Sequence, residues 1–181
     1  MTTKADYTED EWAGLVRAPI LAGAYVAASD MSFFGMIGEM SALYKTMTEG
    51  NAPEAAASLI GEVVAEIEAS KDAKDKLKLP ETKSSATQAA QLVHQLGLDL
   101  EVLDQKSTPD ETRAFKDWLV EIAQATAEAT KEGGFLGIGA VRVSDKEQMA
   151  LATLRHELGV TRISPRRARA AASRAPSAPC R

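Results

Sequence analysis

Apolar side chains recur at intervals of three and four residues along most of the first 160 positions. This spacing places them on one face of an α-helix, and the first such run extends from Trp12 to Val26. Five further runs predict helices over about 36–48, 53–67, 84–98 (with an extension to 103), 109–131 and 145–158. Helices of this length with mostly short connections predict an all-α fold, a compact five- or six-helix bundle.

Capping residues mark the ends of several of these helices. Thr8 and Ser144 are each followed three positions later by a glutamate, which is the capping-box arrangement. Thr108 precedes a proline and then two acids, which also favours a helix start. Gly159 is placed to end the last helix. Pro19 lies inside the first run, so we expect it to kink or restart that helix.

Composition supports the helical prediction and favours a cytoplasmic protein. The 181 residues are 45% hydrophobic and only 5% aromatic, and the abundant Ala, Leu, Glu and Lys favour helix over strand. The longest apolar stretch, 18–28, is about half the length that spans a bilayer. The first residues are polar and acidic, without an apolar signal core. The single cysteine, Cys180, excludes a disulfide within one chain.

Charge divides the chain into two parts. Residues 161–181 contain six arginines and no acid, so residues 1–160 hold the other 15 of the 21 basic residues and all 26 acids. We therefore expect a helical domain over 1–160 and a disordered tail over 161–181. Two interpretations of the tail stay open, an arm for nucleic acid or a membrane surface and a non-native extension from a shifted reading frame. The acidic domain should repel nucleic acid, so such binding is expected only through the tail.

The glycine-rich segment EGGFLGIGAVRVS at 132–144 allows two interpretations. A phosphate-binding P-loop needs Lys and then Ser or Thr after the last glycine, but Ala140 and Val141 stand there. The apolar residues instead suit a loop that packs against the core. The stretch 33–38 is similar to 135–139, and each follows a helix that begins near a tryptophan. A pseudo-twofold repeat of two helix–loop–helix units would explain this similarity, and chance is the alternative.

Two segments carry a resemblance to a known family. APILAGAYVAASD at 18–30 and VRVSDKEQMALATLRHELG at 141–159 are similar to the apolar helix end and the closing helix of TerB-like proteins, named for the tellurite-resistance protein. The wider pattern also resembles a set of bacterial proteins without an assigned activity. The TerB-like resemblance implies an all-helical domain linked to metal or stress responses, in which acidic side chains bind divalent cations.

The same resemblance implies a set of metal ligands. It points to Asp30 and Glu39 in the first half and to Asp145 and Glu147 in the second, around a weakly bound divalent cation. The chain departs from the family where Met31 replaces the glycine after the first acid. A hard cation takes about six oxygen ligands, and a capping box explains Asp145 and Glu147 without a metal. Both interpretations of that pair stay open.

No catalytic residue is indicated by any motif. His94 and His156 lie far apart in the sequence, and neither is part of an HxxxH or HExxH motif that could bind zinc. No Gly-x-Ser-x-Gly sequence surrounds a nucleophilic serine. The sequence therefore favours a helical binding or assembly module of the bacterial cytoplasm, acting with a protein partner or by self-association. The alternative hypothesis is a small metal-dependent hydrolase that uses the carboxylates of Asp30 and Glu39.

Overall fold

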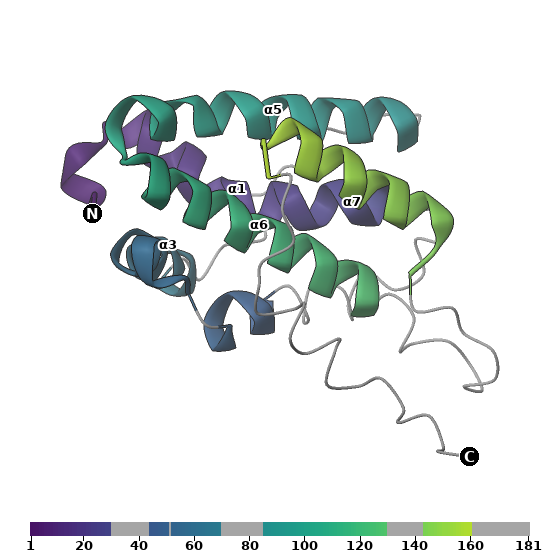
Figure 1. Cartoon of the computed structure of the whole chain (residues 1–181), viewed down its shortest axis with the longest axis horizontal. Helices are drawn as coiled ribbons and strands as arrows, with labels where there is room; N and C mark the ends of the chain where they lie inside the picture. The colour runs from purple at the N-terminus through teal and green to yellow at the C-terminus, as the bar shows by residue number, and fades with distance from the viewer. Residues whose placement is uncertain (30–43, 51, 70–84, 130–142, 161–181) are drawn as a thin grey trace, which may run out of the picture.

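The computed structural model describes residues 1–29, 44–50, 52–69, 85–129 and 143–160. Within these ranges the regular structure is entirely helical, so the predicted all-α bundle is confirmed. Figure 1 shows α5, α6 and α7 running roughly along the long axis, with α3 viewed nearly along its own axis. The elements are η1 (Lys4–Asp6), α1 (Glu9–Ser29), η3 (Glu54–Ala56), α3 (Ala57–Ala69), α5 (Ser85–Lys106), α6 (Pro109–Ala129) and α7 (Asp145–Glu157), and residues 44–49 are also helical.

Helix α1 lies at the centre of the bundle and packs against α5, α6, α7 and α3. The periodicity predicts burial of one face, but the burial is wider and includes Ala18, Leu21, Ala22 and Tyr25. Small side chains along 18–28 allow the neighbouring helices to approach α1 closely. The helix runs unbroken through Pro19, so the expected restart there is wrong. Packing on several sides offsets the backbone hydrogen bond that proline removes.

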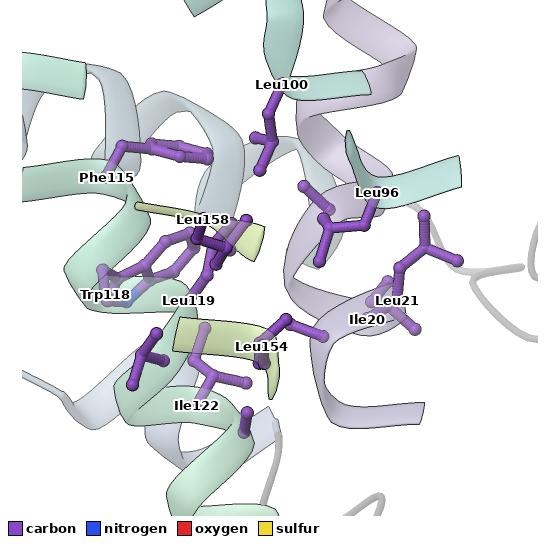
Figure 2. Close-up of a cluster of buried hydrophobic side chains, with 14 of the residues drawn as sticks. Ile20, Leu21, Leu96, Leu100, Phe115, Trp118, Leu119, Ile122, Leu154 and Leu158 are labelled. Carbon is purple, nitrogen blue, oxygen red and sulfur yellow. The ribbon is translucent and has the colours of Figure 1, made fainter. Parts of the chain in front are cut away.

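The core lies between α1, α5, α6 and α7. Four large side chains of α6, namely Phe115, Trp118, Leu119 and Ile122, are all buried. The rings of Phe115 and Trp118 meet edge to face, with centroids 5.4 Å apart. Figure 2 shows these residues in one cluster with Ile20 and Leu21 of α1, Leu96 and Leu100 of α5, Leu154 of α7 and Leu158.

The predicted helix ends agree with the structure at most positions. The backbone N–H of Thr8 donates to Glu11 Oε2 at 2.7 Å, and the N–H of Glu11 donates to Thr8 Oγ1 at 3.3 Å, which confirms that capping box. Gly159 ends α7 with a φ of 69°, the left-handed conformation that favours glycine. Helix α5 continues to Lys106, beyond the predicted end at 98 or 103. Burial of Leu100 and Leu103 offsets the low helix propensity of Gly97.

A buried carboxylate joins α5 to α1. Asp99, whose side chain is 5% exposed, accepts a hydrogen bond from Arg17 Nε at 2.7 Å and another from Nη2 at 2.6 Å. Gln95 Nε2 donates a third at 2.8 Å. Hydrogen bonding to Asp99 raises the pKa of Arg17, although its partial burial opposes this. Gly14 leaves room for the carboxylate, because a Cβ there would lie 3.3 Å from Asp99 Oδ1.

The pseudo-twofold repeat and the disordered tail are both expected on residues outside the described ranges. The two similar loops at 33–38 and 135–139 lie there, so the pseudo-twofold repeat stays a prediction. The tail over 161–181 lies there as well.

None of the described helices combines the length and the apolar character that crossing a bilayer requires.

The surroundings of Gly97 and Gly14 predict different effects on stability when each is replaced by alanine. Gly97→Ala should raise the free energy of unfolding by about 0.5–1 kcal/mol, because Ala favours the helix and a Cβ at Gly97 meets no atom within 4 Å. Gly14→Ala should be at least about 1 kcal/mol less stable than Gly97→Ala, because overpacking is costly and Arg17 and Gln95 hold Asp99 in place. Urea unfolding measures both, and equal stabilisation would contradict the account of Gly14.

Candidate ligand-binding cleft

A cleft of about 310 Å³ opens where α5 meets α6 and where α7 ends. Its walls combine two cations, one carboxylate, two hydroxyls and an apolar surface. The lining residues are Asp104, Ser107, Pro109, Thr112, Arg113, Lys116, Leu158, Gly159 and Val160. Leu158 also belongs to the core cluster of Figure 2, so the cleft lies directly against the core.

Two backbone carbonyls at the helix ends around the cleft already accept hydrogen bonds from the protein. The carbonyl of Leu103 accepts the N–H of Ser107 at 2.9 Å and the hydroxyl of Thr112 at 3.1 Å. At the end of α7, the N–H of Val160 donates to the Arg155 carbonyl at 2.8 Å. These two carbonyls therefore need no donor from a ligand, and the charges of the cleft come from its lining side chains.

The cations of the cleft come from two positions on α6. Lys116 Nζ lies 3.2 Å from each carboxylate oxygen of Asp104, and the side chains of the pair are 16% and 63% exposed, respectively. Arg113 is exposed at the cleft. The described residues include 20 acids and only eight basic side chains. Two cations beside one carboxylate therefore make this cleft a cationic site in an acidic protein.

A hydroxyl cluster adjoins the cleft through Ser107. Its Oγ lies 2.9 Å from Tyr7 Oη and 3.2 Å from Thr2 Oγ1. The backbone N–H of Thr2 donates to Glu111 Oε1 at 2.7 Å. Glu111 is 1% exposed, and its Oε2 lies 3.9 Å from the α-amino group of Met1 without receiving a hydrogen bond from the described residues. Thr2 and Tyr7 thus hold Ser107, one of the residues that line the cleft.

The role of Glu111 is not visible in the sequence. Its position after Thr108 and Pro109 predicts a helix start, and the N–H of Glu111 does donate to Thr108 Oγ1 at 3.3 Å. The buried carboxylate, however, binds Thr2, which lies 109 positions away in the chain. Only the tertiary fold brings these residues together, so no local pattern indicates the contact.

The four predicted metal ligands fall into two groups. Asp30 and Glu39 lie outside the described residues. Asp145 is the exposed first residue of α7, and the buried Glu147 accepts hydrogen bonds from Ser144 N at 2.7 Å and Oγ at 2.9 Å, which confirms the capping box. The described part of the chain contains no group of three His, Cys, Asp or Glu side chains placed to hold a metal ion. A cation site that includes Asp30 and Glu39 stays a prediction.

Asp117 lies one position after Lys116 and is half-buried on α6. Burial raises the pKa of its carboxyl, and the charge of Arg113 opposes that effect. Neither histidine joins the cleft, since His94 on α5 and His156 on α7 are both exposed and neither lines it. The arrangement therefore offers charge recognition from α6 and an apolar wall from α6 and the end of α7.

No family model, curated protein or solved structure matches this chain significantly. The resemblance to TerB-like proteins stays a prediction.

The raised pKa of Asp117 predicts a pH-dependent gain in stability from Asp117→Asn. The folded protein holds this proton more tightly than the unfolded chain, so stability is lost as pH rises from the ordinary pKa of 3.8 through the folded-state pKa. The variant should therefore unfold at a higher temperature than the wild type at pH 7. This advantage should disappear below pH 3.8.

Thermal unfolding at several pH values measures the effect, with Glu101→Gln as a control that removes one exposed carboxylate from α5. An Asp117→Asn variant that is less stable than the wild type at pH 7 would contradict this interpretation of its burial.

Proposed function

We propose that this chain is a helical binding module of the bacterial cytoplasm, and that its ligand occupies the cleft between α5, α6 and the end of α7. The supporting observation is that residues from separate helices converge there on one concave surface with a distinct charge. A volume of about 310 Å³ lies at the lower end of the range for small-molecule sites, roughly 300–1,000 Å³. The ligand is therefore a small molecule or the end of a longer one.

The chemistry of the lining favours binding over catalysis. The hydroxyl of Thr112 donates to the Leu103 carbonyl, and that of Ser107 is bonded to other hydroxyls. A nucleophilic hydroxyl instead needs a neighbouring general base. Pro109, Leu158 and Val160 supply apolar surface, while the charged groups supply orientation, which is the composition typical of a recognition site.

The remaining functional expectations are proposals that stand beside this one. A protein partner or self-association fits a module without converging catalytic groups at its cleft. A link to metal or stress responses depends on the TerB-like resemblance and on Asp30 and Glu39. Titration of the chelator-treated chain with divalent cations addresses that link independently of the cleft.

The proposed site predicts where small molecules bind. We expect ¹H–¹⁵N spectra of the full chain, recorded with a library of neutral, cationic and anionic fragments, to show shift changes concentrated in 104–116 and 158–160. Concave, partly apolar sites collect such fragments regardless of their biological ligand. Fragments that bind elsewhere but leave these residues unchanged would contradict the proposed site, as would the absence of any binding.

A further inference from the structure

The two partners in the ion pair between Lys116 and Asp104 differ in their exposure to solvent. This difference allows a ligand anion to replace Asp104 beside the ammonium. The Lys116 side chain is 16% exposed, so its ammonium stays at the cleft wall, whereas Asp104 is 63% exposed. A largely solvated carboxylate gains little from such a pair, typically below about 1 kcal/mol. Asp104 can therefore leave the ammonium at small cost, while Lys116 remains in the cleft.

Arg113 lies three residues before Lys116 on α6, and residues at that spacing share a helix face. Both line the same cleft. A guanidinium presents five N–H donors in a planar fork, which suits carboxylate and phosphate oxygens. Arg113 makes no hydrogen bond or ion pair with the described residues beyond the electrostatic effect of its charge on Asp117. Arg113 and Lys116 can therefore act on one anionic group.

The rest of the lining limits the kind of anion. Pro109 is exposed in the same cleft as the two cations, and the largely buried Leu158 and Val160 adjoin it as apolar lining. The Leu103 carbonyl beside the cleft already accepts two hydrogen bonds, so it needs no donor from a ligand. An ion without an apolar body leaves the hydrophobic surface in water and forgoes its burial. The cleft is thus suited to an anionic head on a small apolar body.

We propose that the cleft binds a small organic anion, a carboxylate or a phosphate ester, and that Asp104 is an internal competitor that holds Lys116 until the anion displaces it. This inference rests on the proposed function, since it names the ligand class of the same cleft. The head group contacts Arg113 and Lys116, and the apolar body contacts Pro109 and Leu158.

The ligand class is tested by calorimetric titration of the full chain with four probes, namely benzoate, phenyl phosphate, benzyl alcohol and inorganic phosphate. Benzoate or phenyl phosphate should bind at least about fivefold more tightly than the other two, because charge-assisted hydrogen bonds and apolar burial then act together. The tighter of these two identifies the head group. Benzyl alcohol or inorganic phosphate binding as tightly as the better organic anion would overturn the inference.

The competitor role of Asp104 is tested with the tighter probe and two matched variants. Asp104→Asn should strengthen binding about threefold or more, because it frees Lys116 from its ion pair. Glu128→Gln removes the same charge from an exposed position of α6 that does not line the cleft. It lies roughly 18 Å along the helix from Lys116, so it should change the affinity less than about 1.5-fold. Lys116→Gln in the Asp104→Asn background should remove the gain.

Each outcome separates this inference from the proposed function. Equal gains from Asp104→Asn and Glu128→Gln would mean that the effect comes from the general charge of the protein, and would overturn the competitor role. Fragments that shift the cleft residues without preferring a negative charge would keep the proposed function and overturn the anion assignment. Absence of any cleft binding would overturn both. Because Asp104 is largely solvated, its variant should fold normally, and thermal unfolding checks this.

Discussion

Helix α1 has twelve buried residues among its 21 and packs against α3, α5, α6 and α7. A helix buried on several sides must be matched by apolar surfaces from each neighbour, so its burial constrains where those helices lie. Small side chains over 18–28 set how closely the neighbours approach. The two hydrogen bonds from Arg17 of α1 to the buried Asp99 of α5 then favour one register of α5 on α1, because any other register would leave a buried charge without its partner.

The cleft follows from this packing. Only two residues separate α5 from α6, so the walls contributed by Asp104 and Arg113 are held close together. The inner face of α6 places Phe115 and Trp118 in the core, while its outer face carries Arg113 and Lys116. Leu158 anchors the end of α7 in the same core. The cleft is therefore preorganised by apolar burial, and binding there need not order its walls.

Local features of this protein were predictable from sequence, and long-range contacts were not. Periodicity and capping residues predict the helices and their inward faces, because those depend on neighbours within one or two turns. They underestimate the burial of α1, since Ala and Gly carry little hydrophobic signal. Arg113 and Lys116 look like ordinary surface charges until the end of α7 is placed beside them. For the predicted ligands, the structure gives Glu147 a capping role, while Asp30 and Glu39 lie outside the described residues.

The most direct test of the central role of α1 is native-state hydrogen exchange of the full chain. Burial of α1 against its neighbours predicts that its amides over 20–26 exchange only through global unfolding, with the same free energy as the most protected amides of α5 and α6. Exchange of α1 at a distinctly lower free energy, while α5 and α6 stay protected, would contradict the account. The helices that form the cleft would then be held together without α1.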